Sequence, residues 1–383
     1  MNFFLLFLAG QAAAVTISNS TILETLFSIG NLSSGHNVTV IDSVLQLGSV
    51  VSNITDILDD PLANVTFFAP LDSAFVRIQA SESAKLALVR ADDNAEMDGD
   101  LEMIANRSRL EPSLIDVLSY HLVDSVYTVP VACLNASNTS QAIGSIAAGS
   151  PGLPVGQSSF FHKALRLFGM SDEEEFEVEA DKNATCSHGI ATILRTFLTS
   201  SDSPVAIFSA NQSQVIIANA TENDKVMLKS GSIEPSYINS TIHCTNGVLH
   251  LVSNVLEVPM LTSSYLSAAN YTEALGSIIR ANLTDLIDNH PGMTLFAPIN
   301  GNYTNGTFFG NVSIESLIVL DDALYSPLLN GNATRLVALA YDNSNLTMSY
   351  DNSTGVFMVN DTFVIEDLNG LSRNGVVQGI NKK

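Results

Sequence analysis

The sequence predicts a mixed fold of helices and strands in which one domain occurs twice along 383 residues. Three observations predict it. Residues 65–75 join a short apolar stretch, a proline and a residue that can cap a helix, and the same order returns at residues 293–303. Shorter segments on either side of this motif return with it. Residues 332–365 contain short apolar stretches separated by Asn, Asp, Ser and Gly, which is typical of successive strands joined by turns.

The repeated motif predicts a strand that stops at a proline and is followed by a helix. Residues 65–68 are β-branched or aromatic, which favours a buried strand. Pro70 has no N–H to offer a sheet, so the strand is expected to end there. Asp72 can cap the following helix, and Phe75 would begin its apolar face. The second copy repeats the pattern with Phe296, Ala297, Pro298, Asn300 in the capping place and Tyr303 where the first copy has Phe75.

The repeat extends well beyond this motif, so we interpret the chain as two copies of one domain. The matching segments are residues 47–49 with 275–277, 53–58 with 282–287, and 246–250 with 374–378. Glycines at 301, 306 and 310 disfavour a helix after the second copy of the motif, because glycine costs roughly 1 kcal/mol per helical position.

Three motifs follow one another in the first copy: residues 66–75, residues 118–123 around a Tyr-His pair, and residues 246–259. In this order they resemble the fasciclin-like adhesion domains. The second copy keeps the first and last motifs and is degenerate between them, since no Tyr-His pair occurs at residues 319–325. The resemblance rests on Phe68, Ala69, Pro70, Asp72, Phe75, Tyr120, His121, Asn246, Gly247 and His250, and in the second copy on Phe296, Ala297, Pro298, Asn374 and Gly375.

The resemblance implies an α+β fold in which each of two tandem domains is a twisted β-wedge flanked by short helices. It also implies extracellular adhesion through protein or carbohydrate contacts. We expect residues 1–14 to be a signal peptide, 15–260 the first domain and 261–383 the second, degenerate domain.

A long insertion is expected within the first domain. Its motifs stand about a hundred residues further apart than those of the second copy, well beyond an ordinary loop. Residues 128–199 contain a Gly/Ala/Ser/Pro stretch and a run of glutamates, which favour a surface insertion that is disordered in part. A short helix is expected at residues 190–198, and strands are expected at 205–208 and 215–217.

The N-terminus and the sequons predict a secreted glycoprotein. Residues 1–14 form a short apolar core that ends in three alanines, as secretory signals do, although a buried N-terminal strand is the alternative. About twenty Asn-x-Ser/Thr sequons lie along the chain. Asn64 is expected to be a poor acceptor because it adjoins the buried strand. The glycosylation candidates are Asn31, Asn37, Asn53, Asn106, Asn135, Asn183, Asn211, Asn239, Asn282, Asn311 and Asn345.

The charge and the hydropathy of the chain limit the kinds of partner that we expect. The net charge of −23 argues against nucleic acid and anionic membranes, while it permits basic partners or divalent cations. No segment after the leader has the roughly twenty apolar residues that span a bilayer, and residues 374–383 lack the apolar tail of a lipid-anchor signal. We therefore expect an extracellular protein, associated with a cell wall or cell surface; whether the C-terminus once carried an anchor stays open.

Three cysteines are present, so an oxidising compartment would leave one thiol unpaired. Spacing does not decide the pairing. Cys133 with Cys186 is the preferred disulfide because both lie beside or within the insertion, and Cys244 would then be free.

No catalytic motif is found, so neither an enzymatic activity nor a cofactor or metal is expected. His121 and His250 are the most prominent candidates for a metal or acid–base pair, but we expect them to satisfy backbone groups inside the fold. The second copy carries Gln378 in place of the second histidine. The expected partner is a cell-surface or matrix protein or polysaccharide. A secreted hydrolase with a non-local active site and a passive wall or matrix glycoprotein are the alternatives.

Overall fold

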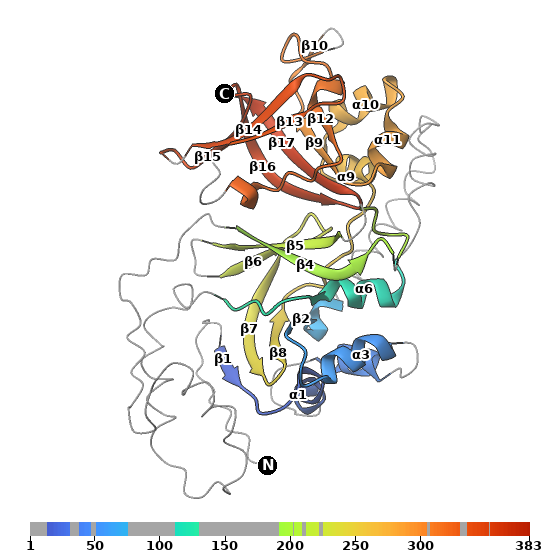
Figure 1. Ribbon diagram of the computed structural model, residues 1–383, viewed down its shortest axis with the longest axis vertical. Coiled ribbons are helices and arrows are strands. Elements are labelled where there is room, and N and C mark those ends of the chain that lie inside the picture. Colours follow the sequence, from blue (N-terminus) through green and yellow to red (C-terminus); the bar gives the residue numbers. More distant parts are fainter. Residues whose placement is uncertain are drawn as a thin grey trace, which may run out of the picture.

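The computed structural model describes residues 14–30, 38–46, 51–75, 112–129, 191–201, 203–208, 212–221, 225–304, 307–329, 335–351 and 353–383. These residues form two large sheets, one from each copy, with helices packed beside them (Figure 1).

The first copy is built around a sheet with the strand order β1-β7-β6-β5-β4-β3-β2-β8. Because β8 also pairs with β7, the strands from β2 to β8 close into a ring. The strands are β1 (Ala14–Ile17), β2 (Val65–Pro70), β3 (Leu122–Val123), β4 (Ala191–Thr199), β5 (Ser213–Ala220), β6 (Val226–Lys229), β7 (Ser236–Cys244) and β8 (Gly247–Val252). The helices are α1 (Ile22–Gly30), α2 (Thr39–Leu45), α3 (Ser52–Asp59) and α6 (Leu114–His121).

The second copy repeats this architecture with the strand order β12-β9-β17-β16-β15-β14-β13. A bridge between Val319 and Ala340 joins its two outer strands. The strands are β9 (Met293–Pro298), β12 (Ile318–Leu320), β13 (Arg335–Leu339), β14 (Asn345–Asp351), β15 (Val356–Val359), β16 (Phe363–Ser372) and β17 (Gly375–Lys382), with a hairpin of β10 (Tyr303–Thr304) and β11 (Thr307–Phe308). The helices are α9 (Thr262–Ala268), α10 (Thr272–Arg280) and α11 (Thr284–Asn289), with 3₁₀ turns η3 (Glu315–Leu317) and η4 (Ser326–Leu329).

Strand pairing shows which elements of the two copies correspond. The last shared motif, residues 246–259 in the first copy and 374–378 in the second, is called the closing motif. In each copy the strand of the first motif lies parallel to the strand of the closing motif, β2 beside β8 and β9 beside β17. It lies antiparallel to a short strand on its other side, β3 or β12. The remaining strands then correspond in order, β4 to β13, β5 to β14, β6 to β15 and β7 to β16.

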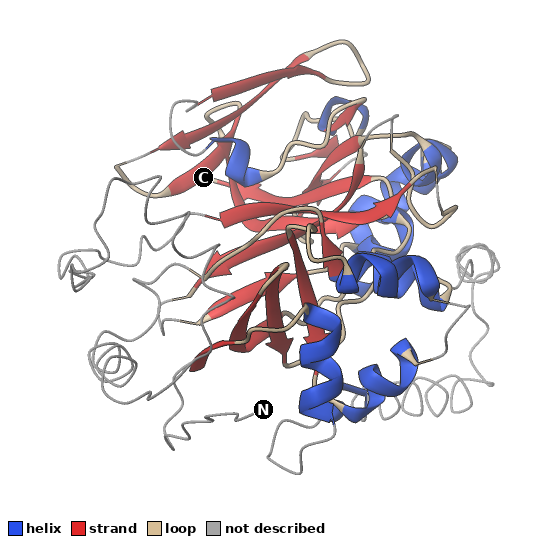
Figure 2. Ribbon diagram, turned by 60° about the horizontal axis from the view of Figure 1, so that its bottom comes forward, coloured by secondary structure: helices blue, strands red, loops and turns tan. Residues whose placement is uncertain are grey.

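Most of the helices gather along one side of the strands (Figure 2). In the first copy, Leu26 of α1, Ile54 of α3 and Phe67 of β2 belong to one apolar cluster with residues of β8. In the second copy, Leu266 of α9 and Leu295 of β9 likewise belong to one apolar cluster. The helices therefore bury their apolar faces on the strands that carry the two shared motifs.

The α+β fold expected from the sequence is confirmed. The strand of the first motif ends at Pro70, and the four strands expected at residues 332–365 are β13 to β16. The hairpin β10–β11 takes the place of a helix after the second motif, as the glycines there predict.

Two sequence predictions near the insertion are wrong. Residues 190–198 were expected to form a helix, but residues 191–199 form strand β4, whose Leu194, Thr196 and Leu198 point inward with the period of two that a strand requires. The last residues of the expected insertion at 128–199 are therefore part of the sheet, and residues 130–190 lie outside the described part. The strand expected at 205–208 is a loop, although Val205 and Phe208 are buried in it.

The two copies meet along a small apolar contact. The first copy contributes the outer face of β4 and β5, and the second copy contributes β16, β17 and the segment before η4 (Figure 1). The buried residues are Val215, Ile217, Tyr325, Leu371 and Val376, with Ala191, Ile193 and Ala323 packed beside them. Each copy thus covers an apolar face of the other.

Polar contacts join the copies around this apolar centre. The carbonyl oxygen of Arg373 accepts hydrogen bonds from Gln214 Nε2 at 2.7 Å and from the Ile207 amide at 3.1 Å. Gln214 is buried, so its amide satisfies the other copy's backbone without facing water.

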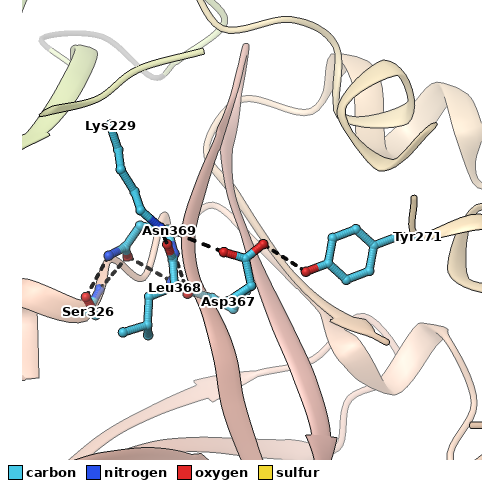
Figure 3. A network of polar contacts seen from close by, with 7 residues as sticks. Lys229, Tyr271, Ser326, Asp367, Leu368 and Asn369 are labelled. Carbon is cyan, nitrogen blue, oxygen red and sulfur yellow. Dashed lines mark hydrogen bonds and ion pairs between the residues drawn. The ribbon is translucent and has the colours of Figure 1, made fainter. Parts of the chain in front are cut away.

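Lys229 at the end of β6 crosses to β16 of the other copy (Figure 3). Its Nζ donates to the Leu368 carbonyl at 2.6 Å and lies 3.7 Å from Asp367 Oδ1. Asp367 Oδ2 accepts from the Tyr271 hydroxyl at 3.0 Å. Burial, and then the neighbouring Asp367 carboxylate, raises the pKa of Tyr271 well above its ordinary value, so Tyr271 remains a donor at any physiological pH.

Candidate functional site

The closing motif of each copy begins with an asparagine that ties helices to the sheet. Asn246 accepts a hydrogen bond from the Ile22 amide at 2.9 Å and donates to the Leu58 and Asp60 carbonyls at 2.9 and 3.0 Å. It therefore holds the start of α1 and the end of α3 with one buried side chain.

Asn374 does the same work in the second copy. It accepts from Thr262 Oγ1 at 2.9 Å, at the start of α9, and donates to the Ile287 and His290 carbonyls at 2.9 and 2.8 Å, at the end of α11. Both asparagines use their amide as donor and acceptor at once, which no apolar residue of that size could do.

The glycine after each asparagine lies against the strand of the first motif. A Cβ at Gly247 would lie 1.9 Å from the Val65 carbonyl oxygen, and a Cβ at Gly375 would lie 1.9 Å from that of Met293. Real Cβ atoms are not found that close to a backbone atom. Both positions therefore require glycine for the parallel strands to pair.

A threonine in the first motif fixes the loop after β3 or β12. Thr66 Oγ1 donates to the Ser125 carbonyl at 2.8 Å and accepts from the Tyr127 amide at 2.7 Å. Thr294 Oγ1 forms the same pair of bonds, with the Asp322 carbonyl at 2.7 Å and the Leu324 amide at 2.7 Å. Both threonines fall at the same place in the repeated motif, although the sequence does not reveal their partners.

His250 completes this corner of the first copy. Its Nε2 donates to the Tyr127 carbonyl at 3.0 Å, and its Nδ1 accepts from Thr241 Oγ1 at 2.9 Å. Its ring stacks on Phe68 with centroids 5.3 Å apart.

Gln378 replaces His250 in the second copy. Its Nε2 donates to the Leu324 carbonyl at 2.9 Å, and Leu324 corresponds to Tyr127. Its Oε1 accepts from the Asn369 amide at 2.8 Å. The glutamine thus keeps the bond to the loop and exchanges the threonine partner for a backbone amide.

Tyr120 and His121 lie inside the first copy at the end of α6. The Tyr120 hydroxyl donates to the Val215 carbonyl at 2.9 Å, and both side chains are buried. His121 Nδ1 donates to the Val117 carbonyl at 2.7 Å, and its Nε2 accepts from the Leu256 amide at 3.0 Å. Both ring nitrogens of this histidine are occupied by backbone groups.

The second copy has no counterpart of this pair, and strand pairing shows where it would stand. Leu122 pairs with Phe67, and Ile318 pairs with Leu295, so residues 120–121 correspond to Ser316 and Leu317. The place lies just before the segment 319–325 expected from the sequence. A short 3₁₀ turn, η3, replaces α6 there.

Burial shifts the titration of both histidines. It lowers the pKa of His121 and of His250 from 6.5 to about 4 each, because a charged imidazole would lose its hydration inside the core. The bonds to Val117 and Tyr127 oppose this shift without cancelling it. Both rings are therefore neutral at ordinary pH, which matches their hydrogen-bond pattern.

Asp72 was expected to cap the helix that follows the first motif, and this expectation is wrong. Its Oδ1 accepts from the Val40 amide at 2.9 Å and its Oδ2 from Thr39 Oγ1 at 2.6 Å, so it caps α2 instead. Asn300 caps the corresponding helix α10, accepting from the Glu273 amide at 3.1 Å. In both copies, the residue two places after the proline holds the start of an earlier helix.

The other residues of the first motif lie within the two cores. Phe68 and Ala69 of β2 are buried, as are Phe296 and Ala297 of β9. Pro70 and Pro298 end their strands in buried positions, and Phe75 is partly buried. The residues that carry the resemblance thus build a framework, and the described ones lie inside it or at its helix ends.

The described glycosylation candidates, unlike the motif residues, lie on the surface. Asn53, Asn239, Asn282, Asn311 and Asn345 are exposed. Asn64 is exposed too, although it directly precedes a buried strand, because the chain reaches solvent one residue before β2 begins. The candidates outside the described residues are Asn31, Asn37, Asn106, Asn135, Asn183 and Asn211.

The cysteine prediction is only partly within the described structure. Cys244 is a free thiol whose Sγ lies 3.5 Å from Thr25 Oγ1, and burial raises the pKa of this thiol to about 11. Cys133 and Cys186, the preferred disulfide, lie outside the described residues, as do residues 1–13 of the expected leader. Ala14 begins β1, which pairs with β7.

Neither a metal-binding cluster nor a membrane span is found in the described part of the chain. No three His, Cys, Asp or Glu side chains come together there in a way that could hold an ion. None of the described helices is both long and apolar enough to cross a bilayer.

Comparison with known proteins gives a local sequence similarity. A fasciclin-like arabinogalactan protein of Arthroderma benhamiae is 35% identical over 98 residues, which is 24% of this chain and 23% of that protein. The matched segment is thus about a quarter of the relative. No model of a known protein family matches the chain.

Among solved structures, a FAS1 domain pair from the insect cell adhesion molecule fasciclin I aligns over 94% of this chain and 96% of its own. The sequence identity is 11% and the TM-score is 0.32. The motifs of the first copy and the matching framework of the second are thus accompanied by a local similarity to a fasciclin-like protein.

Proposed function

We propose that this protein is a secreted, N-glycosylated adhesion protein that binds protein or carbohydrate ligands of a cell surface or matrix through its fasciclin-like domains. One observation carries the proposal: both copies build the same buried framework from the family motifs, through Asn246 and Asn374, Gly247 and Gly375, and Thr66 and Thr294. The chemistry of the motifs is used for folding, which leaves the surface of the pair for contact.

The exposed glycosylation candidates support an extracellular location. All the glycosylation candidates within the described residues are exposed, and they are spread over both copies. A chain with only 14% charged residues would gain much of its solubility from such glycans.

The fixed contact between the copies supports a role in bridging. Buried apolar residues and the Lys229 and Gln214 contacts hold the two domains in one orientation. Two weak sites held at a fixed separation can gain an avidity of 10² or more when a surface presents ligands at a matching separation.

Enzymatic chemistry is the less favoured function. Each ring nitrogen of His121 and of His250 is bonded to a group of the fold, so neither ring can act on a substrate without breaking those bonds. A pKa near 4 also makes both rings poor bases at neutral pH.

The test is adhesion to the immobilised, full-length secreted protein. Cells and wall or matrix polysaccharides should bind it above the level of an unrelated glycoprotein of similar charge. The Gly247→Val variant, in which β2 and β8 cannot pair, should lose that binding if the folded first domain carries it. Enzymatically deglycosylated protein should keep its binding if the polypeptide surface makes the contact.

The other functions give different results. A passive glycoprotein would bind no better than the control, and binding that disappears with the glycans would assign the contact to carbohydrate. Product release from a panel of hydrolase substrates, without adhesion, would replace the proposal with an enzyme.

A further inference from the structure

The outer side of β13 in the second copy is apolar and open. On the outer side of β13, Val337 is 65% exposed and Leu339 is 57% exposed, and Tyr341 just beyond is 44% exposed. Single exposed apolar side chains are ordinary, but three neighbours on an outer strand make a contact surface or an aggregation hazard. β13 pairs along its length with β14 only.

The strand registers identify the same face in the first copy. Val123 pairs with Thr196, and its counterpart Val319 is bridged to Ala340, so Thr196 corresponds to Ala340. Counting back along the strands, Ile193 corresponds to Val337 and Arg195 to Leu339.

The registers of β4 with β5 and of β13 with β14 show which residues of β5 and β14 correspond. Arg195 stands opposite Val215 on β5, and Leu339 stands opposite Asn345 on β14. Asn345 therefore occupies the place of Val215, and Thr347 occupies the place of Ile217.

This face is covered in the first copy and open in the second. In the first copy, Ile193, Val215 and Ile217 are covered by the second copy. In the second copy, the sequence puts a sequon, Asn345-Leu346-Thr347, where the first has Val215 to Ile217. Asn345 is exposed, and a residue directly opposite Leu339 presents its side chain on the same face.

We propose that Asn345 carries an N-linked glycan whose first sugars lie over Val337, Leu339 and Tyr341, in the place that the second domain takes over the first. The proposal rests on the secretory route proposed above. A glycan is bulky and presents both C–H faces and hydroxyl groups, so it can cover apolar side chains while it remains hydrated. It would also keep β13 from pairing with a strand of another molecule.

The test uses full-length protein from a secreting eukaryotic host. Mass spectrometry of the peptide that contains Asn345 should show a glycan. Asn345→Gln and a matched control at another exposed sequon, Asn53→Gln, should each lose one glycan mass. Only Asn345→Gln should lose monomer in light-scattering chromatography and bind more of an apolar dye.

Two further measurements separate shielding from misfolding. Adding Val337→Thr and Leu339→Thr to Asn345→Gln should restore the monomer, because the surface that needs covering is then polar. Enzymatic removal of the glycans from folded wild-type protein should reproduce the association without any mutation.

The results that would contradict this inference differ from those that would contradict the proposed function. An unmodified Asn345 peptide in a protein that is glycosylated elsewhere overturns the inference and leaves the proposed function standing. The absence of glycan at every site overturns both. Association of Asn345→Gln no greater than that of Asn53→Gln shows that nothing at this face needs a cover.

Discussion

At the scale of single residues, the two copies satisfy equivalent buried polar groups with side chains that donate and accept equivalent hydrogen bonds. Asn246 and Asn374 form equivalent bonds, and so do Thr66 and Thr294. The repeat in the sequence marks these positions without revealing their partners, because each partner lies far away along the chain. His250 and Gln378 show an exchange of a titratable ring for an amide that does not titrate.

The two buried histidines of the first copy predict a pH dependence of stability. His121 and His250 have a folded pKa of about 4, below the ordinary 6.5, so the unfolded chain binds more protons between these values. Stability therefore rises with pH across this window and is lost as pH falls from 6.5 toward 4, by about 3 kcal/mol for each histidine. Urea unfolding of the full-length protein at several pH values measures it. His250→Gln should reduce the slope; an unchanged slope would contradict the buried neutral ring.

The glycines of the closing motif predict a large loss of stability from the smallest substitution. Gly375→Ala would put Cβ 1.9 Å from the Met293 carbonyl oxygen, which should cost about 3 kcal/mol or more or prevent folding. Gly310→Ala is the matched control, because its φ of +92° strains the backbone while nothing lies within 4 Å of the new Cβ. It should cost about 1 kcal/mol. Equal thermal shifts in the two variants would refute the close approach.

At the scale of elements, the sequence predicts what local pattern determines. The strand ending at Pro70 and the four strands β13 to β16 are readable because alternation and turn residues act over a few positions. β4 was missed because residues 191–199 also suit a helix, and only pairing with β3 and β5 selects a strand. The role of Asp72 was missed because its partner, α2, begins more than thirty residues earlier.

The two helix caps predict that Asn can replace Asp at this place but Asp cannot replace Asn. Asp72 Oδ1 and Asn300 Oδ1 each accept from the second amide of α2 or α10, whereas Asn300 Nδ2 also donates to the Asn270 carbonyl at 2.6 Å. Asp72→Asn should therefore change the free energy of unfolding little, while Asp72→Ala, Asn300→Ala and Asn300→Asp should each cost about 1 kcal/mol or more, the last because a carboxylate oxygen would face the Asn270 carbonyl. Chemical denaturation of the four variants is the measurement. A loss for Asp72→Asn equal to that for Asp72→Ala would show that the charge, rather than the cap, is needed.

At the scale of the whole molecule, the contact between the copies was not foreseen. Nothing in the sequence distinguishes Val215 and Ile217, which face the other domain, from any apolar pair on a strand that faces its own core. Lys229 and Asp367 likewise stand more than a hundred residues apart, and no short motif joins them. A surface between domains depends on the arrangement of two completed folds, so it becomes visible only in the structure.

This contact predicts that the two domains unfold together. Separation would expose Val215, Ile217, Tyr325 and Leu371 to water, so each folded domain stabilises the other. Calorimetry of the full-length protein at pH 7.5, where His121 and His250 are neutral, should show one transition. Ile217→Asp would place an unpaired carboxylate in the contact and should split the transition in two. Lys229→Met removes the hydrogen bond to Leu368 and the ion pair with Asp367 but leaves the apolar contact, so it should lower the transition temperature slightly and keep the transition single. Two transitions in the unmutated protein would show that the domains are independent, and the fixed separation invoked for bridging would then be lost.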